Sequence, residues 1–135
     1  MGIQDEFNTL WGMTISDIET SLQKDTLTFK LQSFSQGHMS ERKLKFMDVS
    51  AFYYVKDSLS HRFDFYEREK ANYLELTTLY FQRDNAASLS ILLPKEEEWS
   101  ENYPSKANVV MEIWSSVLLI EARVVSLDNQ VINLK

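Results

Sequence analysis

The sequence contains no cysteine. This absence excludes disulfide bonds, catalysis by a thiolate, and zinc or iron–sulfur sites with cysteine ligands. Because no disulfide has to form, we expect the protein in the reducing cytoplasm. Long apolar runs are also missing, and none approaches the roughly 20 residues that a membrane-spanning helix needs. Residues 1–6 lack the basic and apolar regions of a signal peptide, so we expect no membrane association.

Glycine is scarce, with three residues in a chain of 135. Gly2, Gly12 and Gly37 stand too far apart to form a Gly-x-Gly-x-x-Gly loop or a phosphate-binding P-loop. The Gly-x-Ser-x-Gly turn that carries the nucleophile of many hydrolases is absent as well. We therefore expect no nucleotide cofactor, and we predict that the protein is not an enzyme.

Acidic residues outnumber basic ones: the sequence has 14 lysines and arginines and 20 aspartates and glutamates, for a net charge of −6. A nucleic-acid-binding protein needs a basic stripe to neutralise phosphates, so this balance argues against such a partner. Arg42, Lys43 and Lys45 form a local basic group. An acidic surface keeps a protein soluble, and it also suits a basic protein partner.

The rest of the composition is typical of a small globular protein. The chain fits a single domain, residues 1–135, and its 13% aromatic residues supply large side chains for a core. Residues 26–32 alternate apolar and polar side chains, with Leu27, Phe29 and Leu31 on one side. Such alternation is typical of a half-buried strand. We predict a mainly β fold, an antiparallel sandwich or partly open barrel of about eight strands with one or two short helices.

The element boundaries follow from these patterns and from turn residues. Phe7, Leu10 and Trp11 lie at helical spacing and predict a short helix over residues 5–11. Gly37 is expected in a loop with a positive φ angle. Residues 58–71 fit a helix and a strand equally. The predicted strands cover residues 14–22, 26–34, 43–49, 51–55, 73–82, 89–93, 109–127 and 131–134.

Two turns and a core complete this prediction. The turn at 83–86 would join strands 73–82 and 89–93 in a hairpin, and the turn at 127–130 would join the last two strands. Both contain Asp and Asn, which tolerate left-handed φ angles. The core is expected to contain Phe29, Leu31, Phe46, Leu76, Trp114 and Ile120.

One cluster has the residue types of a metal site. His61, Asp64 and Glu67 are spaced by three residues and would roughly share one face of a helix. The simpler interpretation is that they are surface charges, and we adopt it. His38 lies beside Gly37, with no nearby carboxylate to orient it as a base. We accordingly expect no metal ion.

The segment between the two prolines, residues 94–104, carries a candidate binding surface. A tryptophan stands there among acids, and tryptophan is enriched at the energetically dominant positions of interfaces. Acids around it would attract a basic partner. The alternative is that the tryptophan covers a face or an edge of the sheet. The candidate partner-binding residues are Glu96, Glu97, Glu98, Trp99 and Glu101.

The sheet could instead form a pocket for a small molecule. Tyr53, Tyr54, Tyr73 and Tyr80 most simply pack on the sheet, but tyrosines that line a cupped sheet also suit a small-molecule site. The sequence therefore leaves two functions open, engagement of a protein and transport of a small apolar ligand.

Several apolar motifs carry a resemblance to a known family: Leu10-Trp11, the run 27–31 (LTFKL), the run 44–50 (LKFMDVS) and the run 112–116 (EIWSS). With Ile15, Asp17-Ile18 and Ile120-Glu121-Ala122, they resemble the small YxiG-like proteins of Bacillus relatives. That family has no defined catalytic residues. Its members are often found near LXG-type toxin genes, which implies a role as immunity or accessory proteins.

We therefore expect a non-enzymatic cytoplasmic protein that engages a basic partner such as a toxin domain. Steric occlusion and charge complementarity would be the mechanism, with the acids at 96–101 as contacts and Trp99 as anchor. The alternative is a small apolar-ligand carrier that uses the cupped β-sheet. A large apolar cavity would favour the carrier, whereas a closed core with an exposed acidic and aromatic face would favour the protein binder.

Overall fold

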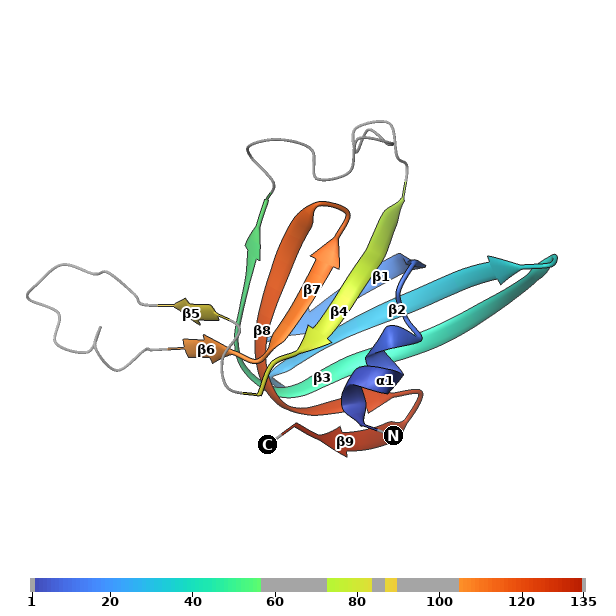
Figure 1. Cartoon of the computed structure of the whole chain (residues 1–135). Helices are drawn as coiled ribbons and strands as arrows, with labels where there is room; N and C mark the ends of the chain where they lie inside the picture. The colour runs from blue at the N-terminus through green and yellow to red at the C-terminus, as the bar shows by residue number, and fades with distance from the viewer. Residues whose placement is uncertain (1, 57–72, 84–86, 90–104, 135) are drawn as a thin grey trace, which may run out of the picture.

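The computed structural model describes residues 2–56, 73–83, 87–89 and 105–134. Within these ranges the chain forms one short helix and nine strands (Figure 1). The prediction of a mainly β protein is thus confirmed. In chain order the elements are α1 (Ile3–Asn8), β1 (Met13–Ser21), β2 (Thr26–Ser35), β3 (His38–Val55), β4 (Leu74–Phe81), β5 (Ala87–Leu89), β6 (Ser105–Ala107), β7 (Val109–Ile113), β8 (Ser116–Leu127) and β9 (Gln130–Asn133).

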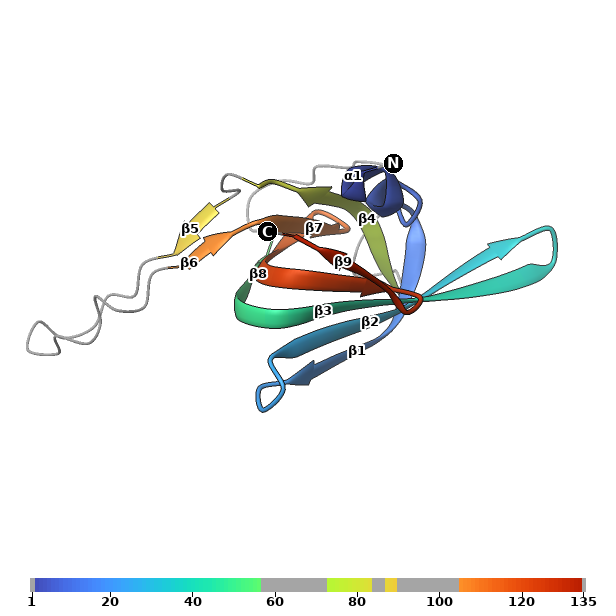
Figure 2. The same ribbon diagram turned by 90° about the horizontal axis from the view of Figure 1, so that it is seen from below.

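Seven strands form one antiparallel sheet in the order β3-β2-β1-β4-β7-β8-β9. A further pairing of β3 with β8 brings the sheet back on itself, so that β1, β2, β3, β8, β7 and β4 form a ring. The ring is weakest between β1 and β4, which pair only through residues 13–15 and 74–76. The structure is therefore a partly open barrel (Figures 1 and 2). β5 and β6 pair separately.

β3 is long because it pairs with two neighbours. It pairs with β2 over residues 38–46 and with β8 over residues 44–55. Asp48 takes a φ of 53°, and the β3–β8 register shifts between Val49 and Ala51. A bulge of this kind bends a strand and increases its twist. The strands predicted at 43–49 and 51–55 are therefore two halves of one bent strand.

A tight turn divides the stretch 109–127, which we predicted as a single strand. β7 ends at Ile113, and β8 begins opposite it at Ser116. Trp114 occupies the turn with a φ of 56°, which bulky residues rarely adopt. The residue is buried, and its indole N–H donates to the Tyr73 carbonyl at 3.1 Å. The prediction was wrong because the sequence has no Gly or Asn at this turn to indicate it. The turn is placed instead by burial of Trp114 in the tertiary structure.

The predicted hairpin between residues 73–82 and 89–93 is also wrong. One edge of β4 pairs with β7, and the other edge faces β1 and the side chain of Gln4. The Gln4 amide donates to the Leu79 carbonyl and accepts from the Phe81 N–H, both at 2.9 Å, as a neighbouring strand would. β5 pairs instead with β6, so a partner distant in the sequence takes the place of the expected hairpin. Residues 90–93 lie outside the described residues.

The helix is shorter than the predicted 5–11 and begins earlier. At its start the Asp5 carboxylate accepts a hydrogen bond from the Gly2 N–H at 3.1 Å. Gly12 turns the chain into β1 with a φ of 87°, and its N–H donates to the Leu76 carbonyl at 2.7 Å. Phe7 is fully buried. In the part of the chain that the structure describes, no helix is long and apolar enough to cross a bilayer.

The core fills the closed part of the barrel. Phe46 lies edge-on to Phe7, with ring centroids 6.4 Å apart, and edge-on to Phe29, with centroids 6.1 Å apart. This edge-to-face geometry adds attraction to burial. The predicted positive φ of Gly37 is confirmed at 79°. All six residues predicted for the core are buried: Phe29, Leu31, Phe46, Leu76, Trp114 and Ile120.

Candidate functional site

The barrel opens where β1 and β4 part. Their ladder covers only three residue pairs and begins at Leu74, the first residue of β4. The β1–β2 register shifts between Ile15 and Asp17, and β1 then continues beside β2 alone in the described structure. A bulge at this point bends β1 away from β4. Among the described residues one end of the barrel is open as a result, and we call this end the mouth.

An apolar cavity of about 290 Å³ lies at the mouth. Every strand of the six-stranded ring contributes to its wall, which is almost wholly apolar. Among the described residues that line it, none is charged and only Thr20 and Tyr54 carry a hydroxyl group. The lining residues are Ile18, Thr20, Leu27, Phe52, Tyr54, Leu74, Ile113 and Leu118.

The cavity continues the core toward solvent. Directly opposite residues of an antiparallel ladder share one face of the sheet. Ile18 pairs with Phe29 and Tyr54 pairs with Leu118, so both point to the inner side of the barrel. Phe29 is fully buried, whereas Ile18 is 39% and Tyr54 47% exposed. Inward-facing side chains therefore reach solvent at the mouth, where no further strand of the described sheet covers them.

The chemistry of this wall favours binding. Removing apolar surface from water is favourable by roughly 25 cal/mol per Å². The described lining residues include no carboxylate, imidazole or amine that could transfer a proton. The hydroxyl groups of Thr20 and Tyr54 can each form a hydrogen bond with a polar atom of a ligand. The cavity is thus suited to a neutral, mostly apolar molecule.

An aromatic pair holds one side of the mouth. Tyr73 precedes the lining residue Leu74, and Trp114 follows the lining residue Ile113. The two rings lie 5.2 Å apart, and the indole N–H of Trp114 donates to the Tyr73 carbonyl. These contacts tie the start of β4 to the β7–β8 turn. The pair therefore sets the spacing of two strands that line the cavity.

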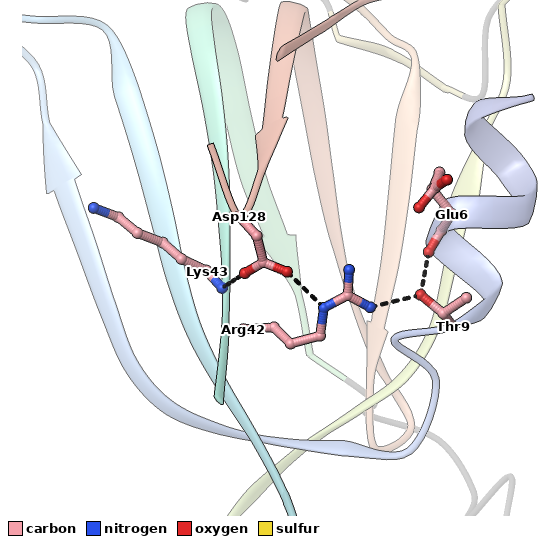
Figure 3. A network of polar contacts seen from close by, with 5 residues as sticks. All are labelled: Glu6, Thr9, Arg42, Lys43 and Asp128. Carbon is pink, nitrogen blue, oxygen red and sulfur yellow. Dashed lines mark hydrogen bonds and ion pairs between the residues drawn. The ribbon is translucent and has the colours of Figure 1, made fainter. Parts of the chain in front are cut away.

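A polar network lies at a different place, between α1, β3 and the β8–β9 turn (Figure 3). Asp128 accepts hydrogen bonds from the backbone N–H of Lys43 at 2.9 Å and from Arg42 Nε at 2.8 Å. Arg42 also donates to the hydroxyl of Thr9, which donates to the Glu6 carbonyl. Burial raises the pKa of Asp128, but the hydrogen bonds from Lys43 and Arg42 and the charge of Arg42 bring this pKa below its ordinary value. The network joins distant elements, and its role is structural.

The site residues predicted from the sequence cannot be placed relative to the mouth, because they fall outside the described ranges. Glu96, Glu97, Glu98, Trp99 and Glu101 lie outside the described residues, as do His61, Asp64 and Glu67. Where the chain is described, no cluster of three or more histidines and acids could hold a metal ion. The engagement of a partner by residues 96–101 stays a prediction.

Of the four tyrosines named for a small-molecule pocket, Tyr54 lines the cavity. Tyr73 packs on Trp114, and the ring of Tyr80 contacts Trp11 at 5.2 Å. Sequence reasoning missed the other lining residues because they come from six strands and have no common spacing. A weak signal was present in residues 52–54, where two aromatic side chains alternate on the inner face.

Comparison with known proteins gives one match. No curated protein and no solved structure is similar enough to this chain to count as a relative. The model of one protein family, described as YxiG-like protein, matches residues 3–132, nearly the whole chain. The motifs at 10–11, 27–31, 44–50 and 112–116 lie within that match. They fall in the turn between α1 and β1, in β2, in β3 and across the β7–β8 turn. This chain is therefore a member of the YxiG-like protein family.

Proposed function

We propose that this protein binds a small, neutral, apolar molecule in the mouth of its barrel. The observation that carries the proposal is the cavity of about 290 Å³, whose apolar walls continue the core. Proteins seldom leave a contiguous set of inward-facing apolar side chains open to water, and such patches mark binding sites. This is the ligand carrier that the sequence left as an alternative.

The volume limits the ligand. A buried apolar cavity of roughly 150 Å³ holds a benzene molecule. The mouth, at about 290 Å³ and open to solvent, suits a molecule with two fused rings, from which a further ring can project, or a short branched hydrocarbon. A carboxylate or ammonium group would find no charged partner among the described lining residues, and desolvating it would be costly. A single hydroxyl or carbonyl could pair with Thr20 or Tyr54.

The test uses the neutral fluorescent probe N-phenyl-1-naphthylamine, whose emission rises in apolar surroundings. We expect saturable binding with one site per chain. Ile18→Asp places a charge on the wall and should weaken binding at least tenfold, whereas Val131→Asp, at an exposed position of β9 that does not line the cavity, should leave it unchanged. Leu74→Asn serves as a second wall variant, and urea unfolding checks that each variant is folded. Equal binding by all variants would place the ligand elsewhere.

We also propose the protein-binding role expected from the sequence, as an immunity-like or accessory protein in the cytoplasm. Its support is the net charge of −6, with Glu96, Glu97, Glu98 and Glu101 surrounding Trp99. A basic partner domain would be attracted to this group and blocked sterically. The two proposed functions use different residues, so variants of the mouth and of residues 96–101 separate them.

A further inference from the structure

The hairpin of β2 and β3 extends beyond the barrel as an arm (Figures 1 and 2). The β1–β2 ladder reaches only to Gln32, and the β3–β8 ladder begins only at Leu44. Beyond these limits the arm consists of residues 33–35 paired with residues 38–40, while residues 41–43 of β3 pair with residues 30–32 of β2. Within the described residues, neither outer edge of this arm pairs with another strand. Such edges are usually protected by charges, proline or bulges, and none of these occurs between Ser33 and Ser40.

One face of the arm points away from the core. Phe29 and Leu31 face the core, so the alternate residues of β2 face outward, together with the residues directly opposite them in β3. The outward pair nearest the turn is Phe34 and Met39, which are 71% and 51% exposed. Exposed apolar side chains in direct opposition near the end of an arm form a small contact patch.

Gln32 and Glu41 form the next pair on this outward face, and lysines follow toward the barrel. Lys30 and Lys43 lie directly opposite each other, and Lys45 follows on the same face of β3. Like charges in direct opposition destabilise a ladder. Lys30 is 4.0 Å from Glu19, an exposed pair, and no ion pair of Lys43 or Lys45 occurs among the described residues. Figure 3 shows the Lys43 ammonium pointing away from Asp128, although the Lys43 backbone is bonded to that residue.

The charge of the arm is opposite to that of the remaining chain. The arm and its base, residues 30–45, contain four basic residues and one acidic residue, for a net charge of +3. Arg42 belongs to the opposite face and pairs with Asp128, so the outward face itself carries +2, from Lys30, Lys43, Lys45 and Glu41. Because the whole chain carries −6, all other residues together carry −9. A basic surface on an acidic protein attracts a partner of opposite sign through long-range steering.

We propose that this outward face of the arm binds an acidic, extended segment of another protein, with one apolar side chain of that segment packed on Phe34 and Met39. The acidic residues of the segment would pair with Lys43 and Lys45. A lipid surface fits less well, because the turn residues Gln36 and Gly37 project beyond the apolar pair and the −9 charge of the remaining chain would oppose an anionic membrane. The proposal is independent of the ligand in the mouth.

The test measures fluorescence anisotropy of a labelled peptide that alternates glutamate and valine over seven residues, with a lysine–valine peptide as its counterpart. We expect the full chain to bind the acidic peptide and to lose affinity as salt is added. Lys43→Glu with Lys45→Glu should weaken binding about tenfold or more, and Phe34→Ser should weaken it about fivefold. Lys24→Glu with Lys106→Glu makes the same change of charge at exposed lysines outside the arm and should leave the affinity nearly unchanged.

Three outcomes would overturn the proposal. The first is equal binding of the acidic and lysine peptides, and the second is binding that the Lys43 and Lys45 double variant does not weaken. The third is self-association of the chain, seen by sedimentation and lost in the same double variant, which would make a second copy the occupant. Binding of N-phenyl-1-naphthylamine should be unaffected by every arm variant, so failure here leaves the proposed ligand site untouched.

Discussion

Ile18 and Phe29 lie directly opposite each other in the β1–β2 ladder, yet Phe29 is fully buried and Ile18 is 39% exposed. Both side chains point to the inner side of the barrel. The difference arises because β4 covers β1 only up to Ile15, so that among the described residues β2 is the one strand beside Ile18. This pair therefore marks the boundary between the packed core and the open mouth.

The pair gives a matched test of that boundary. Phe29→Ala should lower the free energy of unfolding by about 3–5 kcal/mol, because removal of the buried ring leaves a cavity in the packed core. Ile18→Ala should cost less than half as much, because solvent already reaches its side chain. Urea unfolding followed by circular dichroism gives both values. Equal costs at the two positions would mean that the mouth is as tightly packed as the core.

Trp114 tests whether burial places the β7–β8 turn. Trp114→Gly removes left-handed strain of about 1–2 kcal/mol. It also removes a buried indole, a loss of about 3–5 kcal/mol. We therefore expect a net destabilisation of roughly 1–4 kcal/mol in thermal or urea unfolding.

The control for this prediction is Trp114→Phe, which keeps an aromatic ring but loses the hydrogen bond to the Tyr73 carbonyl. Its free energy of unfolding should lie between those of the parent and the glycine variant. If Trp114→Gly is more stable than the parent, backbone strain outweighs the buried indole and our account of the turn is wrong.

Asp128 should make stability depend on pH. Its pKa in the folded protein lies below the ordinary value of 3.8, so the charged form is favoured by folding. The stabilisation is complete above the unfolded pKa and disappears as the pH falls through the folded pKa. The side chain is 44% exposed, so solvent screening keeps the contribution near 1 kcal/mol at pH 7.

Asp128→Asn removes the charge and keeps the size of the side chain. Urea unfolding at pH 7 should show it to be less stable than the parent by about 1 kcal/mol, and the gap should close at pH values below the folded pKa. Glu19→Gln, at an exposed position on β1, is the control and should show a smaller gap at pH 7. A gap of constant size at all pH values would show that the charge of Asp128 does not contribute.

The acidic segment gives a prediction for a basic protein partner. Changing Glu96, Glu97 and Glu98 together to Gln should mainly slow association and weaken its dependence on salt, because exposed charges at the rim of an interface act by steering. Trp99→Ala should mainly speed dissociation, at a cost of roughly 2 kcal/mol or more, because a desolvated anchor is lost. Surface plasmon resonance resolves the two rates. Unchanged rates for both variants would place the interface elsewhere on the chain.

Local pattern was enough to predict most of the strands. The alternation around Phe29 placed β2 within one residue, and Gly37 and the Asp128–Asn129 turn were found from residue type, because their positive φ angles suit only a few side chains. The core residues followed from the same alternation, since burial of one face requires a period of two.

Properties that depend on pairing between distant strands were decided by the tertiary structure. The turn at Trp114 exists because its indole is buried against Tyr73, and β4 lacks a hairpin partner because Gln4 occupies its edge. The mouth exists because β1 and β4 pair over only three residues, which no local pattern around Ile18 reveals. The alternation of a strand shows which side chains face inward, but only its neighbours in the sheet determine whether those side chains are covered.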